Sequence, residues 1–152
     1  MPVSNQVVAA AKALLLGNSE ESAVLTLRLS DADAQVYGLL LQAVLSLAAG
    51  RRFVSGYNDG DVIRYVAKVR AGTDARIQDL DLAPKAAEAV LRHALGKPTP
   101  LETDAQTQMR ALMALLTVVL DDLELEEPGL DALLAEGRVH ADRWLSNSPP
   151  AT

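Results

Sequence analysis

The sequence predicts an all-α protein: a single-domain helical bundle of five to seven helices around a central apolar helix at about residues 31–52. Three observations support this. The chain is 49% hydrophobic but only 3% aromatic, so its core must consist of Leu, Val and Ala, and Ala and Leu are strong helix formers. Residues 34–50 carry no charge, and a helix without a polar face needs partners on every side. Most other segments have one apolar stripe, which suits a ring of helices around the central one.

A length of 152 residues suits one domain with a sizeable core. We predict that this domain occupies residues 1–147 and that residues 148–152 form a disordered tail. The tail contains Pro149 and Pro150, and chain ends that nothing ties down are commonly disordered.

The first helix is expected at residues 5–16, with Ser4 as its N-cap. A second helix start is indicated where Glu21 follows Asn18 by three residues, as in a capping box. Residues 20–29 stay open between a short helix and an extended connector. Their leucines alternate as in a strand, but the sequence contains no second strand to pair with them.

The central helix has consistent signals at both ends. Ser30 is the predicted N-cap, and acidic residues occupy the first turn, where the helix dipole favours them. Arg51 and Arg52 lie at the other end, where cations are favoured. These signals define a helix at about 31–52.

Residues 34–50 could in principle cross a membrane. They are fewer than the roughly 20 apolar residues that a span requires, and the amphipathic companion helices need a soluble core. We therefore predict a buried core helix. The N-terminus has no basic region of the signal-peptide type, so we expect a cytoplasmic protein.

Four further segments complete the predicted architecture. A loop at 55–60 precedes a helix at about 60–71, capped by Asp59, and residues 72–81 are loop-like with Ile77 and Leu80 tucked inward. Pro84 suits the first turn of a helix to Leu95. A further helix begins at Thr99 or Thr103 and reaches about Leu120, followed by an acidic connector at 121–127. Pro128 opens the last helix, which runs to Trp144 with Gly137 as a weak point.

The chain contains an internal echo. A duplicated long-plus-short helix unit would explain it, although Ala/Leu-rich helices also match one another by chance. The echo aligns Ala34-Gln35 with Ala105-Gln106, and then Leu41, Ala43 and Leu45 with Leu112, Ala114 and Leu116.

Charge is segregated along the chain. The net charge is −6 and the pI is about 4.8, which argues against nucleic-acid and anionic-membrane partners. Residues 51–76 carry a net +3, whereas residues 100–152 carry a net −7. The two regions face one another in the fold, or one faces a partner, or both are ordinary solvated surfaces.

No pattern in the sequence predicts catalysis, metal binding or a cofactor. Cysteine is absent, which excludes disulfides and thiolate chemistry. His93 and His140 lie alone, without an HExxH or Glu-x-x-His pattern, and Glu88 with Arg92 suggests an ordinary helix-face pair. Glycine-rich phosphate-binding motifs are also absent. We therefore predict a non-enzymatic protein without catalytic residues, metal or cofactor.

The best candidate site is a basic patch with an aromatic residue. Arg51, Arg52 and Phe53 end the central helix, and Arg64 and Lys68 follow across the loop. Such a patch could bind an acidic protein segment or a phosphate-bearing ligand. In the alternative interpretation Phe53 packs inward and the arginines only cap the helix.

Three stretches carry a family resemblance: Arg51-Arg52-Phe53, Asp61-Val-Ile-Arg-Tyr-Val-Ala67 and Leu91-Arg-His-Ala-Leu-Gly96. In these stretches the chain resembles small Ala/Leu-rich helical proteins of actinobacteria that have no assigned function. The resemblance covers roughly residues 30–145 and implies a cytosolic helical protein. It transfers no functional residue.

Three functional hypotheses follow. The leading one is a non-enzymatic, cytosolic protein-interaction or regulatory helical module, with a protein partner or a second copy of the chain as its ligand. The alternative is a small-molecule-binding bundle with a pocket between the central helices, where Ala and Gly leave room. An enzyme would require His93 or His140 to meet acidic residues in space.

Overall fold

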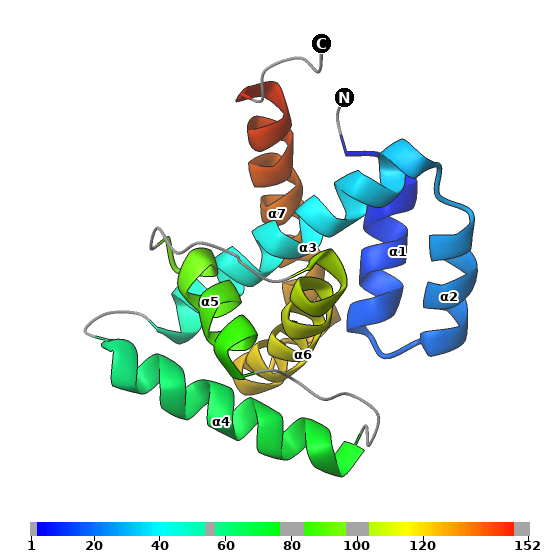
Figure 1. Cartoon of the computed structure of the whole chain (residues 1–152). Coiled ribbons are helices and arrows are strands. Elements are labelled where there is room, and N and C mark those ends of the chain that lie inside the picture. The colour runs from blue at the N-terminus through cyan, green and yellow to red at the C-terminus, as the bar shows by residue number, and fades with distance from the viewer. Residues whose placement is uncertain (1–2, 54–56, 77–83, 97–103, 148–152) are drawn as a thin grey trace. The chain divides into compact units, whose positions relative to one another are not determined.

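The computed structural model describes residues 3–53, 57–76, 84–96 and 104–147, and within them every regular element is a helix. This confirms the predicted all-α class and the expected five to seven helices. The predicted tail at 148–152 and the inward positions of Ile77 and Leu80 lie outside the described residues. The helices, shown in Figure 1, are α1 (Asn5–Leu15), α2 (Ser19–Leu27), α3 (Asp31–Arg52), α4 (Asp59–Arg76), α5 (Pro84–Ala94), α6 (Ala105–Leu123) and α7 (Glu127–Asn147).

The chain divides into two compact units. Unit 1 comprises Met1–Val44 and Leu125–Thr152, and unit 2 comprises Leu45–Glu124. The boundary falls inside α3, whose predicted extent at 31–52 is confirmed. α3 therefore contributes buried side chains to both units, including Leu40 and Leu41 in unit 1 and Leu45 in unit 2.

In unit 1, α1 packs against both α2 and α7. The Ser4 Oγ accepts a hydrogen bond from the Val7 N–H at 3.3 Å, so the predicted cap is confirmed, and Val7 is completely buried. Lys12 forms ion pairs with Glu127 at 3.0 Å and Asp131 at 2.9 Å on α7. These contacts attach α1 to the start of α7.

The N-terminal segment is also attached to α7. Val3 is completely buried; its N–H donates to the Asp142 carboxylate at 2.6 Å, and its carbonyl accepts from Arg138 at 2.6 Å. Arg138 also donates to the side chain of Asn5 at 2.9 Å. One arginine thus fixes the chain on both sides of the α1 cap.

Gly137, where the sequence predicts a weak point of the last helix, is a position of close packing. α7 continues through it without a break. A Cβ placed on Gly137 would lie 2.8 Å from Cγ2 of Val44 and 3.6 Å from Cδ1 of Leu40. Glycine therefore lets α7 approach the Leu40–Val44 turn of α3 more closely than any other residue would.

α2 resolves the ambiguity at residues 20–29 in favour of a helix. It starts after Asn18 as expected, but the Asn18 side chain makes no capping hydrogen bond, so the predicted capping box does not form. Ser22 is buried, and its carbonyl accepts a hydrogen bond from Thr26 Oγ1 at 2.6 Å. The alternation of leucines suggests that they share one buried face, as in a strand. In the helix Leu27 is instead largely exposed.

In unit 2, α4, α5 and α6 pack pairwise against one another. The hydroxyl of Ser46 on α3 donates to the carbonyl of Ala94 at the end of α5. Arg92 of α5 pairs with Asp59 of α4 at 3.4 Å, an inter-helix contact where the sequence suggested pairing with Glu88. The core is aliphatic, as composition predicted: its completely or almost completely buried side chains include Leu45, Val62, Leu91, Leu115 and Leu116.

Two helix starts in unit 2 differ from prediction. Asn58 rather than Asp59 caps α4: its side chain accepts from the Asp61 N–H at 3.0 Å, while Asp61 accepts from the Asn58 N–H at 2.9 Å. α6 is capped by Asp104, which accepts from the Thr107 N–H at 2.7 Å, and not by Thr99 or Thr103. In both cases the cap is the residue directly before the first helical residue.

Three helix ends also differ, and α7 reaches Asn147 rather than the predicted Trp144. α4 reaches Arg76, beyond the predicted end at residue 71. α6 runs to Leu123 and stops at Glu124, whose φ of 51° places it in the left-handed region. The first part of the predicted acidic connector, including Asp122, is therefore helical.

The internal echo falls on buried positions of α3 and α6: Leu41, Ala43 and Leu45 are buried, and so are their counterparts Leu112, Ala114 and Leu116. Any two apolar core helices bury such positions, so the shared burial does not test whether the unit is duplicated. The helices that follow, α4 and α7, have 18 and 21 residues, so the "short" member of the predicted unit is not short.

α3 is the one helix within the described ranges that is long and apolar enough to cross a membrane. Half of its apolar window is buried inside the structure. The core helix of a soluble protein has the same length and composition.

Candidate interaction site

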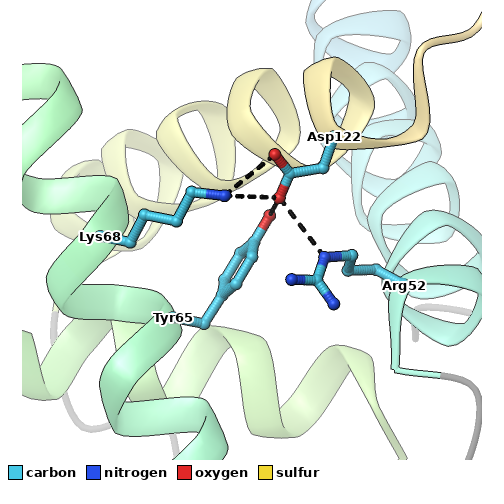
Figure 2. Close-up of polar contacts among 4 residues, drawn as sticks. All are labelled: Arg52, Tyr65, Lys68 and Asp122. Atoms are coloured by element: carbon cyan, nitrogen blue, oxygen red, sulfur yellow. Dashed lines mark hydrogen bonds and ion pairs between the residues drawn. The ribbon is translucent and has the colours of Figure 1, made fainter.

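Asp122 is the centre of a polar cluster in unit 2, which we call the Asp122 cluster: Arg52, Tyr65, Lys68 and Asp122. The Tyr65 hydroxyl donates to Asp122 Oδ2 at 2.8 Å. Lys68 Nζ donates to Oδ1 and Oδ2 at 3.1 and 3.2 Å, and Arg52 Nε lies 3.4 Å from Oδ2. Figure 2 shows the three donors approaching this one carboxylate from two helices.

Local structure places each member. Tyr65 and Lys68 are three residues apart on α4 and so share one helix face. Arg52 is the last residue of α3. Asp122 belongs to the last turn of α6, which exists only because α6 continues past Leu120. The cluster therefore links three helices of unit 2.

Aromatic rings surround the cations. Phe53 makes edge-to-face contacts with Tyr57, at 5.8 Å between ring centroids, and with Tyr65, at 5.2 Å. The Arg52 guanidinium carbon lies 5.5 Å from the Phe53 centroid and 5.3 Å from that of Tyr65, and Lys68 Nζ lies 5.5 Å from Tyr65. These distances are within the range of cation–π attraction. Of the five aromatic residues in the chain, three gather here.

The cluster shifts the pKa of two of its members. Burial alone would raise the pKa of Asp122, but the hydrogen bonds from Tyr65 and Lys68 outweigh it and lower the pKa. Burial, and then the hydrogen bond to the Asp122 carboxylate, raise the pKa of Tyr65 above its usual value. At neutral pH the centre is therefore a carboxylate accepting from a neutral phenol.

The predicted patch is only partly assembled. Arg52, Phe53 and Lys68 come together, whereas Arg64 is directed to Asp61 at the start of α4. Arg51 is exposed in the last turn of α3. Phe53 is half-buried. It is therefore neither the exposed aromatic residue of the patch interpretation nor the inward-packed residue of the alternative. The basic and acidic regions meet at Asp122, which contacts Arg52 and Lys68.

Sequence reasoning missed Tyr65 and Asp122 as site residues. Tyr65 is spaced like the apolar residues of its helix and is buried, so the sequence pattern gives no sign of its hydroxyl's role. Asp122 was assigned to a connector. The available signal was the pair Asp121-Asp122 after the uncharged stretch 111–120. Such a pair fits a connector and a further helical turn equally well.

The two histidines are not brought into an acidic site. His93 is exposed on α5 and His140 is half-buried on α7. Across the described ranges, no group of three or more His, Asp or Glu side chains is arranged to hold a metal ion.

No protein-family model, curated protein or solved structure matches the chain. The resemblance to actinobacterial helical proteins thus stays a prediction.

Proposed function

We propose that the chain is a non-enzymatic protein-interaction module that binds an acidic segment of a partner protein at the Asp122 cluster and the adjoining Phe53. The observation that carries this proposal is the position of the Arg52 guanidinium. Among the contacts of the described residues, only its Nε engages Asp122, and Figure 2 draws no contact to that carboxylate from the two terminal nitrogens. They form the planar fork that binds carboxylates in a bidentate manner.

The surroundings favour binding by this fork. The side chains of Arg52 and Lys68 are 42% and 57% exposed, whereas that of Asp122 is 19% exposed. Asp122 is thus the more buried partner: it restrains Arg52 and Lys68, and both cations still reach solvent. Restraint reduces the entropy lost on binding, and one carboxylate against two cations leaves a positive charge. Arginine and aromatic residues are also enriched in interfaces between proteins.

Fluorescence anisotropy tests this proposal with a labelled Glu-rich peptide and its Gln-substituted counterpart. We expect the wild-type protein to bind the Glu-rich peptide, more weakly as salt rises. Arg52→Lys should weaken binding by about tenfold, because it keeps the charge but removes the fork. Arg143→Gln is the control, since it removes an exposed arginine on α7. The proposal fails if the wild type does not discriminate between the peptides, or if Arg52→Lys binds as the wild type does.

Cytoplasmic action without nucleic-acid or membrane partners belongs to the same proposal. The net charge of −6 and the pI of about 4.8 support it. The small-molecule pocket between the central helices stays a prediction, as does the resemblance to actinobacterial proteins.

A further inference from the structure

α2 leaves two large apolar side chains on its exposed side, although Leu25 is only partly exposed. The side that packs inward holds the buried Ser22, while Val24 and Leu27 are 47% and 86% exposed. Leu27 is the most exposed large hydrophobic side chain among the described residues. An exposed leucine alone is unremarkable, but here two apolar side chains share one face.

That face has a charge of opposite sign at each end. Glu20, Ala23, Val24, Leu27 and Arg28 are all exposed, and their spacings of three and four residues place them on one side of the helix. The acidic residue is in the first turn, the apolar residues are in the middle and the basic residue directly follows the last turn. Neither Glu20 nor Arg28 forms an ion pair within the described part of the chain. We call these five residues the α2 stripe.

We propose that the α2 stripe binds the α2 stripe of a second copy of this chain in an antiparallel, two-fold symmetric pair. Antiparallel pairing about Val24 brings Glu20 opposite Arg28 of the partner subunit, because the two positions are equally far from Val24. The apolar residues then pack between two identical ion pairs. Parallel pairing would place like charges together. The stripe is therefore complementary to itself in one orientation, as an isologous interface requires.

The size of the stripe sets the strength of the dimer. A nine-residue helix is about 13 Å long, and its exposed face is smaller than the roughly 800 Å² per partner of a stable interface. We therefore expect a weak, concentration-dependent dimer, with a Kd roughly in the micromolar range or above.

Sedimentation equilibrium over a wide concentration range measures this dimer. Leu27→Glu should weaken self-association at least about tenfold, because it replaces the most exposed apolar side chain of each stripe with a carboxylate. Val139→Glu is the matched control: Val139 is 55% exposed on α7, so this change has the same chemistry outside the stripe. Circular dichroism verifies that both variants keep their helices.

A mixing experiment tests the charge pattern. Glu20→Arg alone and Arg28→Glu alone should each lose self-association, since each creates two like-charge contacts. An equimolar mixture of the two variants should regain it, because both charge pairs are then opposite. The inference is overturned by a wild type that stays monomeric throughout, by a Leu27→Glu variant that dimerises normally, or by a mixture that stays monomeric. It is independent of the peptide site, which lies in unit 2.

Discussion

At Asp122, one carboxylate accepts hydrogen bonds from a phenol and an ammonium and lies near a guanidinium. A hydrogen bond to a charged group stabilises a fold by about 1.5–3 kcal/mol, more than an exposed ion pair does. The Tyr65 bond is the better protected, because it is partly buried whereas the Lys68 and Arg52 contacts are exposed. Asp122 thus serves both the stability of unit 2 and the placement of the cations that we assign to binding.

Asp122→Asn should lower the free energy of unfolding by about 1–3 kcal/mol at neutral pH, since the amide keeps the shape but loses the charge. The loss should depend on pH. Hydrogen bonds lower the pKa of Asp122 in the folded state, so its contribution is complete above the unfolded pKa of about 3.9. That contribution is lost as pH falls through the folded pKa.

Urea denaturation between pH 7 and pH 3 checks this. The difference between wild type and Asp122→Asn should be constant above about pH 5 and shrink below about pH 4. Asp121→Asn is the control, because Asp121 is the exposed neighbour on the same helix. A difference that does not change with pH would mean that Asp122 stabilises the fold without its charge.

At the scale of the element, most helix starts could be predicted from local capping signals, whereas several helix ends could not. Ser30 accepts from the Asp33 N–H at 3.1 Å as predicted, because a cap is a local interaction. At α4 two candidates, Asn58 and Asp59, are adjacent, and only the reciprocal bond with Asp61 decides between them. The end of α6 has no local stop signal before Glu124, and its last turn carries Asp122, whose partners Arg52 and Tyr65 are distant in the sequence.

The same limit applies to the site. Arg52, Phe53 and Lys68 could be proposed together because they are close in the sequence. Asp122 is separated from Arg52 by 70 residues and from Tyr65 by 57, and no periodicity reports a pairing at that distance. The exposure of Leu27 on α2 was equally unpredictable, because the alternation of the leucines fits a strand and a helix alike.

Gly137 offers an element-scale prediction about α7. Gly137→Ala should lower the free energy of unfolding by about 1–3 kcal/mol, because the new Cβ would lie 2.8 Å from Cγ2 of Val44 and a buried valine in a helix has little rotamer freedom. Ala is otherwise the better helix former by up to about 1 kcal/mol. The clash should outweigh this gain.

Gly50→Ala is the matched control, since a Cβ on Gly50 meets nothing within 4 Å. It should leave stability unchanged or raise it by up to about 1 kcal/mol. Thermal and urea denaturation of both variants separate the two effects. Equal stabilisation by both changes would show that α7 moves away from α3 without loss.

At the scale of the whole molecule, α3 passes through both units and buries side chains in each. A helix is cooperative along its length, so we expect the two units to unfold in one transition, as a single domain over 1–147 would. The chain has one tryptophan, Trp144, which reports on unit 1. Leu115→Ala removes a completely buried side chain from unit 2 and should cost about 2–5 kcal/mol.

If α3 couples the units, Leu115→Ala shifts the Trp144 fluorescence transition to lower urea by the same amount as the circular dichroism transition. Leu133→Ala, which truncates a completely buried leucine of unit 1, should move both probes together as well. If fluorescence keeps its midpoint in Leu115→Ala while circular dichroism separates into two steps, the units unfold independently. α3 would then fray at Val44–Leu45, and the single-domain prediction would be wrong.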